Sequence, residues 1–120
     1  MSETLYPSST VALSDAHNRL APEPHDAFQK FSRKVFAKGA LTTKTKQLIA
    51  VAAAHVTQCP YCIRGHTRAA MREGATREEL LEAIWVAAEM RAGATYAHSV
   101  LALDEMEKAA PSTDNVIAKD

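Results

Sequence analysis

The stretch KTKQLIAVAAAHVTQCPYCIRGHTRAAMREGATREELLEAI, residues 44–84, decides the fold. It is rich in alanine, a strong helix former, and its apolar residues recur three or four positions apart. Leu48, Ile49, Ala52 and Ala53 form one apolar stripe, whose small side chains allow close approach of a neighbouring helix. No part of the sequence combines strict apolar–polar alternation with β-branched enrichment. The sequence therefore predicts an all-α protein.

Capping residues divide this stretch into separate helices. The pair Thr42–Thr43 supplies an N-cap for the first helix, and Cys59–Pro60 matches the N-cap and first position of the second. Gly74 is typical of the residue that follows a helix C-terminus. Residues 76–79 then begin with threonine and end with glutamate, which is the pattern of a capping box. We expect a new helix to begin there.

Further helices are expected on both sides of this stretch. Pro24 opens a helix that runs to about Ala37 and stops at Gly39. On the other side, Gly93 is expected to end the helix that follows the capping box, and a last helix covers about residues 95–109. The large apolar residues of these helices include Phe28, Phe31, Val35, Trp85, Met90 and Tyr96. We interpret Trp85, Met90 and Tyr96 as core residues, with a subunit interface as the alternative.

The chain of 120 residues fits one domain. Residues 1–22 are predicted to be an N-terminal arm, with a helical turn near residues 14–20. Residues 23–110 are predicted to form a compact bundle of five to six helices, and residues 111–120 a flexible C-terminal tail.

Charge and composition narrow the classes of function. Lys+Arg and Asp+Glu number 14 each, so nothing in the net charge favours nucleic acid as a partner. The sequence contains no signal-peptide pattern and no apolar run of about 18 residues, so we expect a cytoplasmic protein without membrane contact. In a reducing compartment, two cysteines close together indicate catalysis or metal binding rather than a permanent disulfide.

Both cysteines lie in QCPYCIRGH, residues 58–66. If a helix begins near Cys59, then Cys62 and His66 return to the same face of that helix. The helix N-terminus favours a thiolate over a thiol, and this lowers the pKa of a cysteine placed there. His66 can accept the proton of Cys62, and the second thiol can attack an oxidised sulfur to close a disulfide. The pattern favours two-electron redox chemistry.

Two other interpretations of the cysteines remain open. Cys, Cys and His are zinc ligands, and His55 or His98 supplies a candidate for the fourth ligand. However, complete zinc patterns usually carry their ligands in two pairs, and the second pair is absent from this sequence. The cysteines could also be inert thiols, because free cysteine is often buried.

From about residue 44 to residue 100 the chain resembles the carboxymuconolactone decarboxylase superfamily, and within it the alkylhydroperoxidase AhpD-like branch. The resemblance rests on CxxC followed by xxxH, then Gly-Ala-Thr and Glu-Glu-Leu, in this order within residues 59–80. It implies an all-helical subunit that assembles as a homotrimer or homohexamer. The decarboxylase proper lacks the CxxC dithiol and is therefore matched less well.

The resemblance also implies roles for the site residues. Cys62 would be the peroxidatic cysteine, Cys59 the resolving cysteine and His66 the base. The helix-terminus argument alone favours Cys59 as the more acidic thiol, so the two interpretations disagree; we follow the family, since access and a nearby base also govern attack. The family relay uses a glutamate twelve residues before the first cysteine, where this chain has Gln47, whose amide cannot take up a proton.

Two neighbouring residues are weaker candidates for the site. His55 could join the relay, although a histidine in an alanine-rich helix is as often a hydrogen-bonded core residue. Tyr61, where some family members carry a histidine, could orient a water molecule in the pocket.

The function expected from these residues is that of a thiol-dependent hydroperoxide reductase. Its substrate would be a hydroperoxide, its reductant an external dithiol or thiol-redox protein, and no cofactor or metal is expected. Two alternatives remain: a redox-sensing or binding protein with a reversible disulfide, which the loss of the glutamate at Gln47 favours, and a small-molecule enzyme similar to the decarboxylase.

Overall fold

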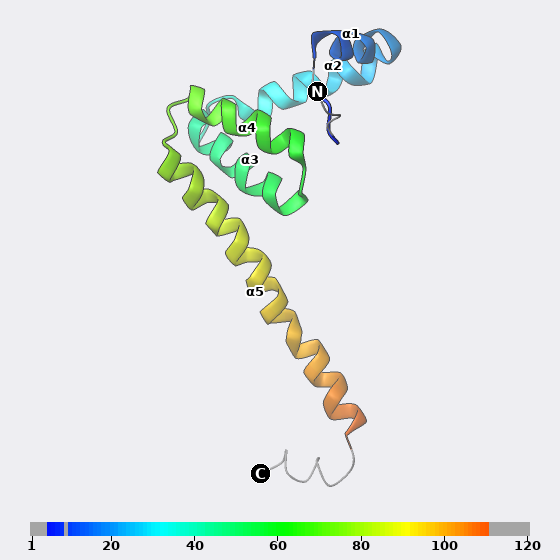
Figure 1. The fold of residues 1–120 in the computed structure, drawn as a ribbon, viewed down its shortest axis with the longest axis vertical. Coiled ribbons are helices and arrows are strands. Elements are labelled where there is room, and N and C mark those ends of the chain that lie inside the picture. Colours follow the sequence, from blue (N-terminus) through cyan, green and yellow to red (C-terminus); the bar gives the residue numbers. More distant parts are fainter. Residues whose placement is uncertain (1–4, 9, 111–120) are drawn as a thin grey trace.

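The structure, a computed structural model, describes residues 5–8 and 10–110, which contain five helices and no strand (Figure 1). The prediction of an all-α fold is confirmed. The helices are α1 (Val11–Leu20), α2 (Pro22–Phe36), α3 (Thr43–Thr57), α4 (Pro60–Arg72) and α5 (Arg77–Ala109). The predicted dithiol is at the start of α4. The predicted domain boundaries remain predictions, and the expected tail at residues 111–120 lies outside the described residues.

The expected bundle is formed by α3, α4 and the beginning of α5. Both α4 and α5 pack on α3, whereas α1 and α2 lie together to one side and the rest of α5 projects away (Figure 1). The radius of gyration is 22.1 Å, against about 14 Å for a compact globule of this chain length. The single chain is therefore elongated around one packed region.

The core of the packed region is small and made mainly of short side chains. Val51 and Ala70 are completely buried, and they pack with Ala75 and Leu80. On α3 the buried residues are Gln47, Val51 and Ala54. The predicted stripe was therefore partly wrong, because Ile49 is 52% exposed whereas Val51 and Ala54, which lie outside that stripe, are buried.

The local capping signals predicted from sequence are confirmed. Thr42 and Cys59 are the N-caps of α3 and α4, and each side chain accepts a hydrogen bond from the third residue beyond it. Gly74 follows α4 with a positive φ of 94°, a conformation that glycine adopts without strain. Thr76 and Glu79 form both hydrogen bonds of the capping box.

The predicted break at Gly93 was wrong, because α5 continues through it for 33 residues. Glycine within a helix costs about 1 kcal/mol relative to alanine. Strong helix formers flank Gly93 on both sides, so this single local cost does not end the helix. At the other end of the chain, α1 and α2 are also longer than predicted, and α2 starts at Pro22 rather than Pro24.

The C-terminal end of α2 is attached to the first turn of α3. The Thr43 hydroxyl donates to the Phe36 carbonyl at 3.0 Å. The Lys46 ammonium donates to the Val35 carbonyl at 2.8 Å and also to the Ala37 carbonyl. These bonds satisfy carbonyl groups that a helix end leaves without intrahelical partners. They also fix Phe36 next to α4.

Several large apolar side chains predicted to be core are exposed. Trp85 is 70%, Met90 60% and Tyr96 82% exposed, so the core interpretation was wrong for the single chain. The apolar face of α2 is exposed as well, since Phe28 is 65% and Phe31 63% exposed. Aromatic side chains are rarely left in water in such number without a partner surface.

None of the described helices is both long and apolar enough to cross a membrane.

Candidate functional site

The turn between α3 and α4 places the first cysteine at a helix N-terminus. Gln58 adopts the left-handed conformation with φ 59°, and the Cys59 amide donates back to the Ala54 carbonyl at 3.1 Å. The chain therefore reverses sharply before α4. Cys59 Sγ then accepts a hydrogen bond from the Cys62 amide at 3.2 Å, so the sulfur itself caps the helix.

The two thiols have pKa values that move in opposite directions. The pKa of Cys59 is lowered, first because the Cys62 thiol donates a hydrogen bond to it and then because the Cys62 amide does. The pKa of Cys62 is raised, because its proton is held by Cys59 and because burial disfavours its charged form. At rest, the thiolate is thus favoured on Cys59, as the helix-terminus argument predicted.

The cavity next to the dithiol is lined by the other cysteine, Cys62. A cavity of about 500 Å³ lies between α2, α3 and α4. It is lined by Ser32, Arg33, Phe36, Gln47, Tyr61, Cys62, Gly65, His66 and Ala69. Cys62 therefore opens onto the same space as His66, whereas Cys59 does not line it. A small molecule that enters this cavity meets Cys62 first.

His66 is held on both of its sides by residues of other helices. Its Nδ1 lies 2.7 Å from Gln47 Oε1, and its ring stacks on Phe36 with centroids 5.1 Å apart. An amide oxygen can only accept a hydrogen bond, so Nδ1 carries the hydrogen and Nε2 keeps a free lone pair. Gln47 is only 8% exposed. The arrangement leaves Nε2 as the proton acceptor.

The two weaker candidates are placed differently. His55 Nδ1 lies 2.8 Å from the Val51 carbonyl of its own helix, and His55 does not line the cavity. The Tyr61 ring lines the cavity, but its hydroxyl donates to the Pro7 carbonyl at 2.7 Å. Tyr61 thus ties the segment before α1 to α4. The structure brings together Gln47, Tyr61, Cys62 and His66.

The contribution of α2 to the cavity was missed by the sequence interpretation. Ser32, Arg33 and Phe36 all line it. The predicted apolar face of α2 contained Phe28, Phe31 and Val35, and Phe36 falls one position beyond it. No local signal distinguishes Phe36, because its position over His66 depends on how α2 is attached to α3 by the hydrogen bonds of Thr43 and Lys46.

Among residues 5–8 and 10–110, no three His, Cys, Asp or Glu side chains converge in an arrangement that could hold a metal ion. His98, one of the candidates for a fourth zinc ligand, contacts the Ala94 carbonyl on the projecting part of α5 at 3.1 Å.

Comparison with known proteins agrees with this architecture. Residues 22–105 match the carboxymuconolactone decarboxylase family. An uncharacterised protein of the cox locus of Paracoccus denitrificans is 54% identical over 112 residues, which cover 91% of this chain and 100% of that protein.

Two solved structures of family members are similar in fold as well. The crystal structure of an apo family protein from Legionella pneumophila is 35% identical, with a TM-score of 0.65 over 81% of this chain and 87% of that one. A family protein from Thermotoga maritima, for which involvement in an antioxidative response has been suggested, is 29% identical, with a TM-score of 0.58 and the same coverage. By fold and by sequence, this chain belongs to the carboxymuconolactone decarboxylase family.

Proposed function

We propose that this protein is a thiol-dependent hydroperoxide reductase. The observation that carries the proposal is the shared cavity in which Cys62, His66 and Gln47 meet, with the second thiol next to Cys62. The suggested antioxidative role of the Thermotoga maritima relative is consistent with this chemistry. The reductant would be an external dithiol or a thiol-redox protein, as found in the reducing cytoplasm.

In the first step, His66 Nε2 accepts the proton of the Cys62 thiol. The Cys62 thiolate then attacks the terminal oxygen of the hydroperoxide, and the O–O bond breaks. The alkoxide that leaves takes up a proton from the imidazolium and departs as an alcohol. Cys62 is left as a sulfenic acid, oxidised by two electrons.

In the second step, the Cys59 thiolate attacks the Cys62 sulfenic sulfur. The S–O bond breaks, hydroxide leaves as water after protonation, and a disulfide joins the two cysteines. An external dithiol then reduces this disulfide through a mixed disulfide and is itself oxidised. The lowered pKa of Cys59 suits this role, because Cys59 is the thiol that must be ionised when the sulfenic acid appears.

Gln47 has a positioning role in this proposal rather than a role in moving protons. Its amide oxygen holds the Nδ1 hydrogen of His66, as a carboxylate would, and so selects the tautomer with a free Nε2. Gln47 does not stabilise the protonated imidazole by charge, in contrast to a glutamate. We therefore expect turnover at a lower rate than with a carboxylate in the same place.

Peroxide consumption tests the proposal. The protein would be assayed with cumene hydroperoxide and dithiothreitol, with Cys62→Ser as the matched control. We expect consumption by the wild type and none above background by the variant. In Cys59→Ser, a sulfenic acid should accumulate at Cys62 and react with dimedone. Consumption equal in wild type and Cys62→Ser would overturn the proposal. Turnover of a lactone substrate that persists in a double Cys→Ser variant would favour a decarboxylase-like enzyme.

A redox switch without turnover is the second candidate, and Gln47 is the observation that favours it. Cys59 Sγ caps α4 only while it is free to accept from the Cys62 amide, so oxidation would alter the start of this helix. Gel filtration of the reduced and oxidised protein distinguishes this candidate. Identical profiles, together with steady peroxide turnover, would exclude it.

We propose further that the protein works as a homo-oligomer, a trimer or a hexamer. Every residue from 94 to 109 of α5 is exposed in the single chain. Its exposed apolar residues include Tyr96, Val100, Leu101, Leu103 and Met106, which are at least 54% exposed. A helix that is apolar on several sides is usually buried between others. Light scattering of the purified protein measures the assembly.

A further inference from the structure

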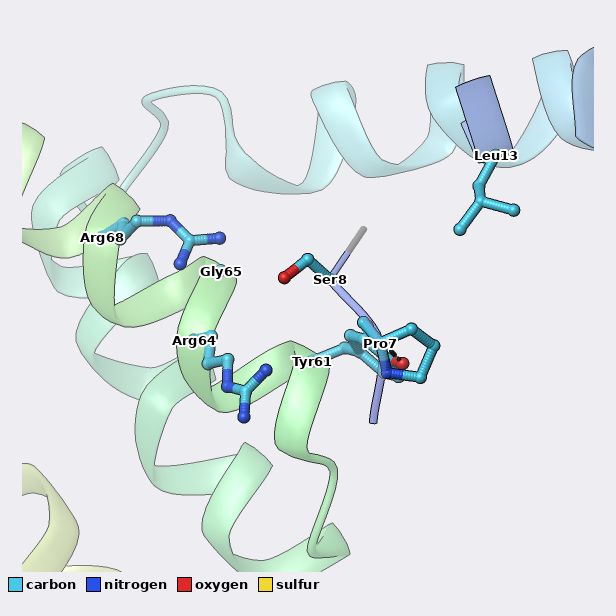
Figure 2. Close-up of a pocket in the computed structure, with 7 residues that line it drawn as sticks. All are labelled: Pro7, Ser8, Leu13, Tyr61, Arg64, Gly65 and Arg68. Atoms are coloured by element: carbon cyan, nitrogen blue, oxygen red, sulfur yellow. Dashed lines mark hydrogen bonds between the residues drawn. The ribbon is translucent and has the colours of Figure 1, made fainter. Parts of the chain in front are cut away.

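A second cavity shares Tyr61 and Gly65 with the dithiol cavity. Its volume is about 660 Å³, and it is lined by Pro7, Ser8, Leu13, Tyr61, Arg64, Gly65 and Arg68. Figure 2 shows the Arg68 guanidinium directed from α4 toward Ser8, while the Arg64 side chain leaves the preceding turn of α4 with its guanidinium farther from Ser8. The opposite wall is the segment before α1.

This wall is held in place by Tyr61. The Tyr61 hydroxyl donates to the Pro7 carbonyl at 2.7 Å, and its ring meets Tyr6 edge to face with centroids 6.0 Å apart. These two contacts bring Pro7 and Ser8 against α4. The cavity therefore forms between defined side chains and is more than a depression on one helix.

The cavity is positively charged although the protein as a whole is neutral. Arg64 and Arg68 have no carboxylate within 4.0 Å among the described residues. No Asp or Glu lines this cavity or the dithiol cavity, to which Arg33 adds a further cation. A guanidinium presents a planar fork of donors that matches a carboxylate. Two guanidinium groups on successive turns of α4, without a carboxylate partner, favour the binding of an anion.

The two cavities are neighbours that share part of their lining. Tyr61 and Gly65 line both of them, and Cys62, Gly65 and Arg68 follow one another three residues apart along α4. The spacing places Arg68 about 9 Å along the helix axis from Cys62. A single molecule can therefore reach from the arginines to the reactive sulfur across Gly65.

The presence of glycine at position 65 fits its place between the two cavities. Glycine is unfavourable inside a helix, and Gly65 has no positive φ that would require it. A Cβ atom built at this position meets nothing within 4 Å, so packing inside the subunit does not require glycine either. Its absent side chain leaves open space at a residue that lines both cavities.

We propose that the two neighbouring cavities together bind an organic hydroperoxide that carries a carboxylate. Arg64 and Arg68 hold the carboxylate, and the peroxide group reaches Cys62. Leu13 and Phe36 give the two ends of the path apolar surface for a hydrocarbon chain. The substrate class is thus a fatty-acid-like hydroperoxide. This inference rests on the proposed peroxidase function, which it makes more specific.

The test compares linoleic acid hydroperoxide with its methyl ester, using dithiothreitol as reductant. The variant is Arg64→Gln/Arg68→Gln, and the matched control is Arg72→Gln, an exposed arginine of the same helix that lines neither cavity. We expect kcat/KM for the acid to fall about tenfold or more in the double variant, through KM. The values for the ester and for the control variant should stay within about twofold.

A second measurement keeps this inference separate from the peroxidase proposal. Decanoate, which cannot react, would be titrated into the wild type and the double variant by calorimetry. We expect binding to the wild type and a Kd at least about tenfold weaker in the variant. If decanoate binds in this way but no peroxide is consumed, the peroxidase proposal fails and the anion site stands.

Three outcomes would overturn the anion site. They are no decanoate binding by the wild type, an equal loss of kcat/KM for the acid and the ester, and a loss that appears only with a protein reductant. In the last case the arginines would bind an acidic protein surface instead. The variant Gly65→Val provides a further check, since it should reduce kcat/KM for the acid more than for hydrogen peroxide, which does not need to span both cavities.

Discussion

The region around α3 and α4 and the distal part of α5, residues 92–109, have opposite relations to solvent. In the first region Val51 is completely buried, and Gln47, a polar residue, is buried with its side-chain oxygen bonded to His66. In the second, apolar side chains as large as Tyr96 are 82% exposed. Both regions are helical and rich in alanine, so helix propensity does not explain the difference.

The difference shows in which part of the molecule a single chain buries its own apolar side chains. The dithiol cavity is built from α2, α3 and α4 of one subunit, and its hydrogen bonds lie within that subunit. The distal part of α5 has no such partners among the described residues. Near the middle of α5, Arg91 donates a hydrogen bond to the Val56 carbonyl of α3 at 2.9 Å. The proposed chemistry and the proposed assembly thus fall on separate parts of the chain.

The largest expected effect is on the buried side of this comparison. Val51→Asp would place a carboxylate in the core, where it has no water and no partner. We expect a loss of about 4 kcal/mol or more of unfolding free energy, enough to unfold the protein. Urea denaturation followed by circular dichroism measures it. Val100→Asp, the matched change on the distal part of α5, should keep its helical signal; unfolding of both variants would contradict the distinction.

The second prediction concerns the exposed side. Tyr96→Glu/Leu103→Glu should dissociate the oligomer, because charges would be placed in the apolar contact between subunits. We expect the dissociation constant to rise about a hundredfold or more. Light scattering measures the mass, and the matched control is Glu105→Gln, an exposed charge on the same part of the helix. A wild type that is already monomeric would refute the assigned role of the distal part.

A third prediction sharpens the description of the packed region. Gln47→Leu would remove the acceptor of the Nδ1 hydrogen of His66, and we expect kcat/KM to fall about tenfold. Gln47→Glu should keep this bond and favour the protonated imidazole by charge. The protonated imidazole forms when the base takes the Cys62 proton, so kcat/KM should be higher in Gln47→Glu than in the wild type. Equal kcat/KM in the wild type and Gln47→Leu would show that Gln47 does not position the base.

The smallest expected effect is on thiol reactivity. The pKa of Cys59 is lowered and that of Cys62 is raised, so below pH 9 the thiolate fraction should be larger on Cys59. Iodoacetamide should therefore modify Cys59 several times faster at neutral pH, as read by peptide mass spectrometry. Cys62→Ser removes the thiol that donates to Cys59 and should slow the reaction of Cys59. Equal rates of modification at both thiols would contradict the assigned order of the pKa values. If Cys59 is also modified faster in Tyr96→Glu/Leu103→Glu, the dithiol site does not depend on assembly.

Local signals in the sequence were sufficient for much of the fold. Thr42, Cys59, Gly74 and the pair Thr76–Glu79 were predicted as helix ends and are found there, because a cap depends on residues at most a few positions away. Gly93 was wrongly predicted to end a helix, because that prediction rested on a single residue. Glycine is only a weak signal for the end of a helix, and the helix-forming residues on both sides of Gly93 outweigh it.

Three features could be predicted from the sequence alone: the all-α class, the position of the dithiol at a helix N-terminus, and the common face of Cys62 and His66. These follow from helical periodicity and capping, which act over a few residues. Only the tertiary structure decided that Gln47 accepts the Nδ1 hydrogen of His66, that Phe36 covers its ring and that the segment before α1 closes an arginine-lined cavity. Such contacts join residues far apart in the chain, so they depend on how the helices cross.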